Sequence, residues 1–253
     1  MSDGMLAGRR IMITGAARGL GRQIASAAAA AGAQLVLSDI LQDELATTAA
    51  ALRGEGHAVE DLYIDQADPD SIEQGMARVA ADGPLDGLVN NAALATNVGG
   101  KTMHEYDQDL WDRVMQVNVR GVWLMTRAAV PLLKGGDRRG KVVNMASDTA
   151  LWGAPRLMAY VASKGAVISM SRAMARELGS DNICVNVVAP GLTRVEATEY
   201  VPQERWDYYA AGRSLAGEQQ ADDVDGTVLY LLSGWSDFVS GQVIPVNGGF
   251  VFN

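Results

Sequence analysis

The sequence Ile11-Met12-Ile13-Thr14-Gly15-Ala16-Ala17-Arg18-Gly19-Leu20-Gly21 joins a short apolar run to a loop that carries three glycines. The apolar run is typical of a buried strand, and the residues after the loop repeat on one stripe of a helix that Gly32 ends. Glycine lets a backbone approach a pyrophosphate closely, and a helix N-terminus offers free N–H groups. The unit therefore favours a nucleotide site, although its spacing differs from Gly-x-Gly-x-x-Gly and such a turn can also serve packing alone.

Outward from this unit, strand-like runs alternate with helical patterns. Further strands are predicted at 35–37, 59–64, 85–89, 141–145, 183–188 and 242–246, and further helices at 42–53, from 69 onward, and at 108–133, 155–178 and 222–232. The stretch 192–219 has a mixed, irregular pattern. The alternation predicts a parallel sheet covered on both faces. No linker or repeat interrupts it, so we predict a single α/β domain over 1–253.

Composition excludes several classes of function. The net charge of −9 argues against nonspecific nucleic-acid binding. Cys184 is the only cysteine, so no intrachain disulfide can form and a reducing, cytoplasmic location is expected. Residues 1–10 lack the apolar core of a signal peptide, and no apolar run is long enough to span a membrane. His57 and His104 are the only histidines, so no metal site is expected.

Asp39 follows the second strand, about twenty residues beyond the glycine loop. A carboxylate there can accept hydrogen bonds from an adenosine ribose diol and repel a 2′-phosphate. A solvated loop aspartate is an equal alternative from the sequence alone. Arg18 complicates the reading, because a basic residue in the glycine loop could pair with a 2′-phosphate. Asp39 lies where that phosphate would sit, and it therefore carries more weight.

Tyr160 and Lys164 stand four residues apart in a predicted helix, on one face and one turn apart. A phenol has a pKa of about 10, and a cation held beside it favours the phenolate and lowers that value. The two residues could therefore transfer a proton. The spacing also occurs often by chance on ordinary surface helices.

The chain resembles a short-chain dehydrogenase/reductase of the short, single-domain branch. The resemblance runs nearly end to end, through Thr14-Gly15-x-x-x-Gly19-x-Gly21, Asp65, Asn90-Asn91-Ala92, Asn118, Ser147, Tyr160-x-x-x-Lys164, Asn186 and Pro190-Gly191. It implies a Rossmann-type, three-layer, doubly wound parallel sheet of about seven strands. It also implies a nicotinamide cofactor and an Asn-Ser-Tyr-Lys active site.

The resemblance assigns the catalytic roles to Asn118, Ser147, Tyr160 and Lys164. Tyr160 would be the general acid/base, and Lys164 would lower its pKa and bind the nicotinamide ribose. Ser147 would hydrogen-bond the substrate oxygen. Asn118 would hold a water that links Lys164 to solvent, although a polar residue could also merely kink its long helix.

The cofactor site that the resemblance implies spans the whole chain. Asp65 would fix the adenine ring, Asn91 would shape the sheet end, and Thr193 would meet the nicotinamide amide. The full set is Gly15, Arg18, Gly19, Leu20, Asp39, Ile40, Asp65, Gln66, Asn91, Ala92, Tyr160, Lys164, Pro190, Gly191 and Thr193. Because of Asp39 we expect NAD, with NADP less favoured.

Two positions depart from the family pattern. Ala93 replaces the usual glycine after Asn-Asn-Ala, and its methyl group could trim space near the cofactor or substrate. Val195 replaces a frequent threonine, so one side-chain contact to the nicotinamide amide could be missing. Neither change removes a catalytic group.

Substrate contacts are expected from the loop after Ser147 and from a lid at 192–219. Aromatic residues in both segments suggest a hydrophobic or aromatic small molecule, although they could equally pack the lid or a subunit contact. The predicted substrate residues are Ser147, Thr149, Trp152, Tyr160 and Trp206.

The sequence therefore predicts an NAD-dependent oxidoreductase that interconverts a secondary alcohol and a ketone. A reductase of 3-oxoacyl-carrier-protein type is an alternative, and so is a catalytically idle member that senses cofactor. By resemblance we expect a homotetramer, paired through the helices near 108–133 and 155–178 and through residues 242–253. The apolar tail 250–252 would suit burial in such a contact.

Overall fold

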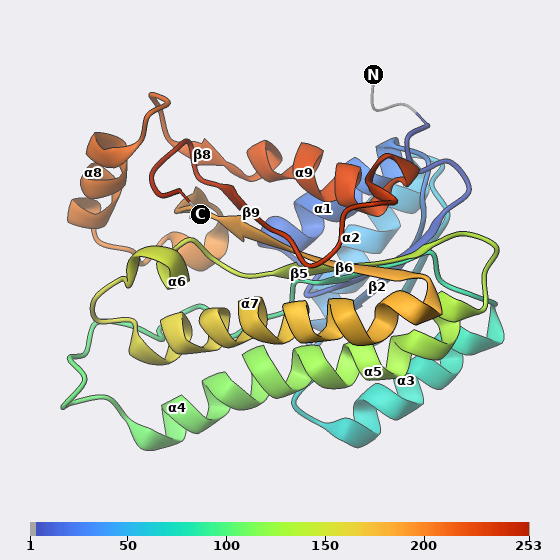
Figure 1. Cartoon of the computed structure of the whole chain (residues 1–253), viewed down its shortest axis with the longest axis horizontal. Coiled ribbons are helices and arrows are strands. Elements are labelled where there is room, and N and C mark those ends of the chain that lie inside the picture. Colours follow the sequence, from blue (N-terminus) through green and yellow to red (C-terminus); the bar gives the residue numbers. More distant parts are fainter. Residues whose placement is uncertain (1–3, 253) are drawn as a thin grey trace.

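The computed structural model describes residues 4–252 and has the predicted three-layer, doubly wound α/β fold (Figure 1). Seven parallel strands form one sheet in the order β3-β2-β1-β4-β5-β6-β9. They are Arg10–Thr14 (β1), Gln34–Asp39 (β2), Val59–Tyr63 (β3), Gly87–Asn90 (β4), Gly140–Met145 (β5), Ile183–Pro190 (β6) and Val243–Val246 (β9). The strand order reverses between β1 and β4, which is where open α/β sheets bind ligands.

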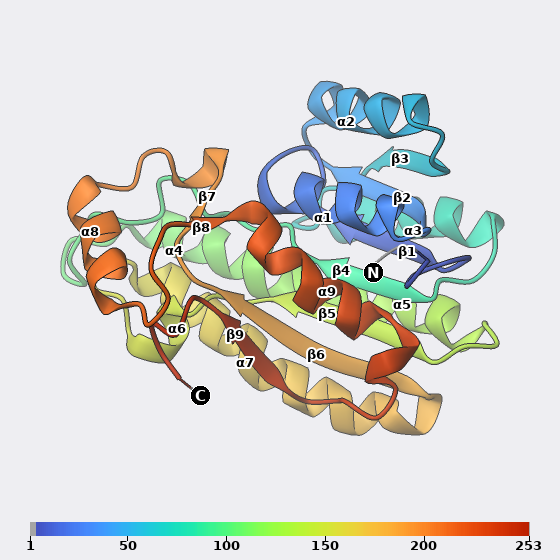
Figure 2. The same cartoon turned by 90° about the horizontal axis from the view of Figure 1, so that it is seen from above.

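Helices cover both faces of the sheet (Figures 1 and 2). One face carries α1 (Gly19–Ala30), α2 (Gln42–Gly54) and α9 (Asp225–Leu232), and the other carries α3 (Pro69–Ala81), α4 (Gln108–Met115), α5 (Val122–Lys134) and α7 (Met158–Leu178). Every residue of β5 and β6 is buried, as expected of strands covered on both sides. Within residues 4–252, no helix combines the length and the apolar character that crossing a bilayer requires.

The two long predicted helices differ in detail from expectation. The helix predicted at 108–133 is a rod in which the π-helical turn Gln116–Gly121 (η1) joins α4 to α5. The helix predicted from 155 begins only at Met158. Gly153 and Arg156 have φ values of 74° and 59°, which no right-handed helix contains.

The segment 192–219 is more regular than predicted. Strands β7 (Thr193–Arg194) and β8 (Gln219–Gln220) form a small parallel sheet, and α8 (Gln203–Gly212) lies between them in sequence. The helix escaped prediction because only Trp206 and Tyr209 of α8 are buried, so no apolar stripe marks it. The remaining short helices are α6 (Thr149–Trp152), η2 (Gly179–Asp181), η3 (Glu196–Thr198), η4 (Ala221–Val224) and η5 (Gly234–Ser236).

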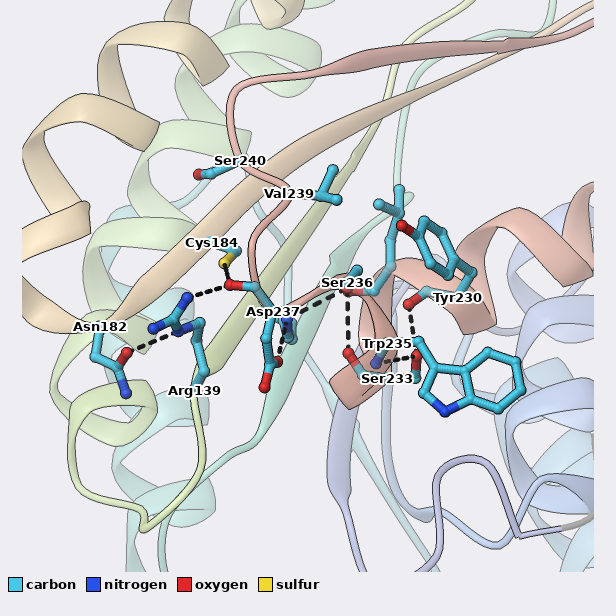
Figure 3. A network of polar contacts seen from close by, with 12 residues as sticks. Arg139, Asn182, Cys184, Tyr230, Ser233, Trp235, Ser236, Asp237, Val239 and Ser240 are labelled. Atoms are coloured by element: carbon cyan, nitrogen blue, oxygen red, sulfur yellow. Dashed lines mark hydrogen bonds and ion pairs between the residues drawn. The ribbon is translucent and has the colours of Figure 1, made fainter.

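Polar contacts hold together the end of the sheet at which β5 and β6 begin (Figure 3). The buried Lys141 pairs with Asp237 at 2.8 Å and donates to Ser236 Oγ at 3.2 Å. Arg139 donates to Asn182 Oδ1 at 2.7 Å and also to the carbonyl of Asp237. These contacts tie η5 and the turn after it to the starts of the two central strands. The opposite end of the sheet, where the parallel strands terminate, carries none of these contacts and holds the candidate site.

Candidate active site

The carboxyl ends of β1 and β4 are joined by Thr14 and Asn91. The Thr14 hydroxyl accepts from the backbone N–H groups of Asn91 and Ala92 at 3.1 and 3.0 Å. The Asn91 side chain donates to the carbonyls of Thr14 and Gly15, both at 3.0 Å. Asn91 therefore shapes the crevice edge through protein contacts, as the resemblance implied.

Glycine stands at the three loop positions for different physical reasons. A Cβ at Gly21 would lie 2.0 Å from the carbonyl oxygen of Gly15, and one at Gly15 would lie 2.7 Å from Cα of Ala92. These two glycines allow close packing. Gly19 has φ +58°, yet a Cβ there would meet no atom nearer than 3.7 Å. Gly19 therefore owes its place to its backbone conformation, and its position at the N-terminus of α1, beside a cavity, fits the approach of a pyrophosphate.

A cavity of about 450 Å³ adjoins Gly19. Its lining includes Arg22 of α1 and Glu196 of η3, which form an ion pair at 2.7 Å. The pair links the first turn of α1 to the lid segment across this cavity. The cavity therefore lies between the glycine loop and the lid, where a dinucleotide could lie.

Asp39 ends β2 and is fixed against the glycine loop. Its carboxylate accepts from the N–H of Ala17 at 3.0 Å and from the N–H of Leu41 at 3.1 Å. Arg18 is exposed in the loop, and Ile40 is 56% exposed. Leu20 is half-buried against the core beneath α1. The loop and the end of β2 thus form one surface that holds a fixed carboxylate.

Asp65 and Gln66 follow β3, but their side chains differ in surroundings. The Asp65 carboxylate is half-buried and accepts from the N–H of Ala67 at 2.9 Å. Gln66 is buried, and its amide donates to the carbonyls of Ala92 and Val117 at 2.8 and 2.9 Å. Gln66 therefore braces the crevice against η1, and both of its side-chain N–H groups are used in that contact.

Asn118 lies in the π-helical turn η1 and is fully buried. Its side-chain oxygen accepts from the N–H of Leu94 at 2.7 Å, and its amide donates to the Leu94 carbonyl at 3.1 Å. The amide also donates to Ser163 Oγ at 3.2 Å. The side chain thus ties the loop after β4 to α7, the helix that carries Tyr160 and Lys164.

Ser147, Tyr160 and Lys164 come together at the ends of β5 and α7. The hydroxyls of Ser147 and Tyr160 share a hydrogen bond, and Thr149 donates to Ser147 Oγ at 2.9 Å. Lys164 Nζ donates to the Met145 carbonyl at 2.7 Å and lies 5.6 Å from the centre of the Tyr160 ring. The predicted catalytic residues therefore share one site.

Burial dominates the electrostatics of this site. Burial raises the pKa of Tyr160 to about 12, although the Ser147 hydrogen bond acts in the other direction. Burial also lowers the pKa of Lys164 to about 8. Desolvation is the largest effect on both side chains, whereas the expected pKa below about 10 for the phenol depends on Lys164 together with an oxidised nicotinamide and stays a prediction.

A cavity of about 820 Å³ opens in front of Ser147 and Tyr160. Thr149 and Trp152 line it from α6, Leu157 lines it just before α7, and Tyr208 and Tyr209 line it from α8. This volume lies within the range of small-molecule sites. A small substrate could therefore place a polar oxygen against Ser147 and Tyr160 while its body contacts apolar walls.

Pro190, Gly191 and Thr193 connect the cavity to the cofactor side. The Pro190 carbonyl accepts from the N–H of Asp148 at 2.9 Å, and Gly191 lines the cavity. Thr193 is buried and donates to the Gly191 carbonyl at 3.0 Å. Near Val195, the Thr198 hydroxyl donates to the Thr193 carbonyl at 2.7 Å. A threonine hydroxyl thus lies close to Val195, the position at which the family frequently has a threonine and this chain does not.

Trp206 is a correction among the predicted substrate residues. It is 4% exposed, the Arg194 guanidinium lies 3.6 Å from its ring centre, and it does not line the cavity. The helix turns this side chain away from the cavity and turns Tyr208 and Tyr209 toward it. Ser147, Thr149, Trp152 and Tyr160 all line the cavity as predicted.

The wall beside Ser147 contains a buried acid that the sequence did not single out for a role. Asp148 is fully buried and accepts from the Tyr209 hydroxyl at 2.7 Å. Trp152 Nε1 donates to the same hydroxyl at 3.2 Å. Burial raises the pKa of Asp148 to about 6, although the hydrogen bond from Tyr209 acts in the other direction. Asp148 thus fastens the lid helix α8 to the strand end that carries Ser147.

The apolar tail is partly used within its own chain. Phe250 stacks on Tyr209 with ring centres 4.1 Å apart and also packs edge-on against Trp152 and Tyr208. Phe250 therefore needs no second subunit to account for its packing. Phe252 remains 80% exposed.

Comparisons with known proteins cover almost the whole chain. A family model described as Enoyl-(Acyl carrier protein) reductase matches residues 15–251. The 3-oxoacyl-(acyl-carrier-protein) reductase of Thermotoga maritima is 34% identical and covers 97% of this chain and 99% of that protein. Gluconate 5-dehydrogenase of Gluconobacter oxydans is 33% identical, with 96% of this chain and 95% of that protein covered.

Solved structures agree with these sequence matches. A gluconate 5-dehydrogenase from Burkholderia cenocepacia, in complex with NADP and tartrate, superposes with a TM-score of 0.92 at 30% identity. The match covers 98% of each chain. A putative gluconate dehydrogenase from Agrobacterium tumefaciens gives a TM-score of 0.91 at 30% identity, over 98% of this chain and 97% of that one.

Proposed function

The chain belongs to the short-chain dehydrogenase/reductase family, and from this premise we propose that it interconverts a secondary alcohol and a ketone by NAD-dependent hydride transfer. The observation that carries the proposal is the hydrogen-bonded Ser147–Tyr160 pair facing a cavity of about 820 Å³. The apolar and aromatic walls favour a small molecule with a hydrophobic or aromatic body. The whole chain acts as a single catalytic domain, with residues 192–219 as the substrate lid.

The proposed division of labour follows from the contacts. Tyr160 takes the hydroxyl proton of the alcohol, and Ser147 hydrogen-bonds the same oxygen. Lys164, anchored on the Met145 carbonyl, holds the ribose side of the cofactor beside Tyr160. Asn118 fixes α7 relative to the loop after β4. A nicotinamide bound there would supply the hydride acceptor, and its oxidised form would add positive charge near the phenol.

The cofactor site fits a nicotinamide dinucleotide, and we propose NAD rather than NADP. The cavity that Gly19 lines leaves room for the pyrophosphate, and the fixed Asp39 carboxylate would repel a 2′-phosphate. The exposed Arg18 and the NADP named with the Burkholderia cenocepacia structure favour the alternative. Asp39 weighs more, because two backbone N–H groups hold it at the ribose position.

Two alternative functions make different demands on the protein. A reductase of 3-oxoacyl-carrier-protein type is favoured by the Thermotoga maritima relative and would require recognition of a carrier protein. The net charge of −9 disfavours an acidic carrier as partner. A catalytically idle cofactor sensor would lack turnover, and the assembled Asn118, Ser147, Tyr160 and Lys164 set argues against it.

We also propose a cytoplasmic homotetramer. Helices α4, α5 and α7 and the region of β9 would form the contacts, as the family resemblance implies. Trp123 on α5 is 46% exposed and Phe252 is 80% exposed, so both could be covered in such an assembly.

A rate assay tests the proposed reaction. The wild-type enzyme is given NAD or NADP and a panel of secondary alcohols, among them neutral ones such as 1-phenylethanol. We expect oxidation that Tyr160→Phe slows by roughly 10²–10⁴-fold in kcat, which is the usual contribution of a general acid/base. Cofactor affinity and melting temperature should stay near the wild-type values. Near-normal turnover by Tyr160→Phe would refute the assignment.

A further inference from the structure

We propose that the substrate carries a carboxylate, and that Arg205 binds it with help from Arg156. This inference rests on the proposed function, since it concerns the body of the same substrate. Both arginines line the cavity of about 820 Å³ that Ser147 and Tyr160 also face. Arg205 comes from the lid helix α8, and Arg156 comes from the turn before α7.

Arg205 is held in the cavity wall with unused hydrogen-bonding capacity. Its Nη2 donates to the Pro155 carbonyl at 3.2 Å, and its guanidinium carbon lies 5.3 Å from the ring centre of Trp152. Its Nη1 is buried and has no hydrogen-bond partner among residues 4–252. A buried donor without a partner is unfavourable, and a carboxylate is the acceptor that best matches a guanidinium. The Arg205 guanidinium therefore keeps hydrogen-bonding capacity that an anion in the cavity could use.

The charges around the cavity support the same conclusion. Its charged lining residues are Arg156, Arg205 and Glu204. Within the described part of the chain neither arginine forms an ion pair, and Glu204 pairs with neither of them. Arg156 lies near the exposed Glu105, which limits its contribution. Arg205 forms no ion pair with the adjacent Glu204, so we take it as the principal anion-binding group.

The backbone conformation of Arg156 independently supports a binding site at this part of the cavity. Arg156 has φ +59°, a conformation that non-glycine residues seldom adopt and that is enriched at binding sites. Its carbonyl accepts from the N–H of Gly100 at 2.9 Å, which fixes the turn at the cavity mouth. The turn presents this arginine on the same rim as the loop 97–100.

The first experiment compares acids with their neutral esters on the wild-type enzyme. The probes are 2-hydroxy-3-phenylpropanoate, 3-hydroxy-3-phenylpropanoate and 4-hydroxy-4-phenylbutanoate, each beside its methyl ester. They place the carboxylate one, two or three bonds from the reacting carbon. We expect at least one acid to exceed its ester by roughly tenfold to a hundredfold in kcat/KM, as befits a charge-assisted contact. Esters that match or exceed all three acids would overturn the proposal.

The second experiment assigns the preference to Arg205. Arg205→Met should abolish the acid-over-ester ratio, Arg205→Lys should retain part of it, and Arg156→Gln should lower it less. Arg78→Met is the matched control, because Arg78 is exposed on α3 at the other end of the molecule (Figure 1). The control should keep the full ratio. An unchanged ratio in a folded Arg205→Met enzyme contradicts the assignment.

Binding without turnover separates this inference from the proposed function. Calorimetric titration of 3-phenylpropanoate, which has no alcohol to oxidise, should show binding that its methyl ester lacks and that Arg205→Met loses. If it binds in this way while no alcohol is oxidised, the anion site stands and the proposed function fails. If neutral alcohols and esters are oxidised but the acids neither bind nor react better, the proposed function stands and the anion site fails.

Discussion

At the scale of single residues, the phenol of Tyr160 is enclosed where its ionised form is poorly solvated, and its pKa rises to about 12. In the cofactor-free enzyme we expect no tyrosinate signal from this residue below about pH 10, because the raised pKa keeps it protonated. NAD⁺ should shift its ionisation to lower pH, since a positive charge nearby favours the phenolate. The measurement is the absorbance difference between wild type and Tyr160→Phe during a pH titration, with and without NAD⁺. Identical titrations in the two states would contradict it.

Asp39 decides the cofactor in our proposal, and its replacement tests that choice. Asp39→Ala removes the charge that would repel a 2′-phosphate, so we expect the NAD-over-NADP ratio of kcat/KM to fall by roughly tenfold to a hundredfold. Asp43→Ala is the matched control, because Asp43 is an exposed acid in the first turn of α2. Equal kcat/KM values with NADP and NAD for the wild-type enzyme would by themselves refute the proposed preference.

Asp148 makes stability depend on pH. Its pKa in the folded chain is about 6, above the ordinary 3.8, so the folded state favours the protonated carboxyl. The associated stability is complete below about pH 4 and is lost as the pH rises through about 6, amounting to at most about 3 kcal/mol. Asp148→Asn keeps an acceptor for the Tyr209 hydroxyl and cannot ionise. The variant should therefore lose less stability than wild type between pH 4 and 7.

Thermal unfolding of both proteins at these two pH values measures the effect of Asp148. Wild type and Asp148→Asn share every other titrating group, so the difference between their pH responses isolates this carboxyl. Equal pH responses would show that Asp148 ionises in the folded chain as easily as in the unfolded one.

The site residues that the sequence could predict are those with a local signature. The glycine loop and the Tyr160–Lys164 pair stand at a strand end and on one helix turn, so their positions suggested a chemistry that the family resemblance made specific. The resemblance alone supplied the role of Asn91. The role of Asp148 depends on Tyr209, which lies 61 residues further along the chain. Arg205 contacts Pro155 across 50 residues. Such pairs are created by the folding of the lid, and no local pattern records them.

At the scale of elements, the first strand, loop and helix depend on one steric contact. A Cβ at Gly21 would lie 2.0 Å from the Gly15 carbonyl oxygen, so Gly21→Ala must displace the loop or the helix. We expect the variant to lose about 1–3 kcal/mol of unfolding free energy or more, which is the usual cost of overpacking. Chemical denaturation measures the loss.

The matched control for this steric argument is Gly54→Ala. Gly54 is the last residue of α2, and a Cβ there would meet no atom within 4 Å. A helical glycine-to-alanine change with free space stabilises by about 0.4–1 kcal/mol. If both variants change stability alike, the close packing of Gly21 is not what constrains the loop.

The elements that the sequence missed share one physical cause. Helix α8 lies on the surface with only two buried side chains, so its apolar residues mark no continuous stripe. The start of α7 was placed three residues early, because the left-handed conformation of Arg156 leaves no trace in the residue type. The buried strands were predicted closely, since uninterrupted apolar runs between helices have few other interpretations.

At the scale of the whole molecule, a parallel sheet covered on both faces was predictable because strands and helices alternate, and the family resemblance supplied its doubly wound type. The assembly is a separate matter, and the proposed homotetramer gives the prediction at this scale. Light scattering at micromolar concentration should give a mass near four times 26.8 kDa. Trp123→Asp, on the exposed side of α5, should weaken the assembly. Trp235→Asp is the control, since Trp235 is 75% exposed but lies outside the proposed contact regions. A monomeric wild type would refute the proposal.

The buried Lys141, paired with Asp237 at the edge of the sheet where β5 begins, also bears on chemical labelling. The chain has four lysines, and Lys141 and Lys164 are both buried. The side-chain amines open to bulky reagents are therefore those of Lys101 and Lys134, which are exposed. Lys134 is the last residue of α5, and its amine forms an ion pair with Asp181 at 2.7 Å. Among the side chains, an amine-reactive dye or resin would thus attach at two defined surface points, and both internal lysines would keep their free amines during immobilisation.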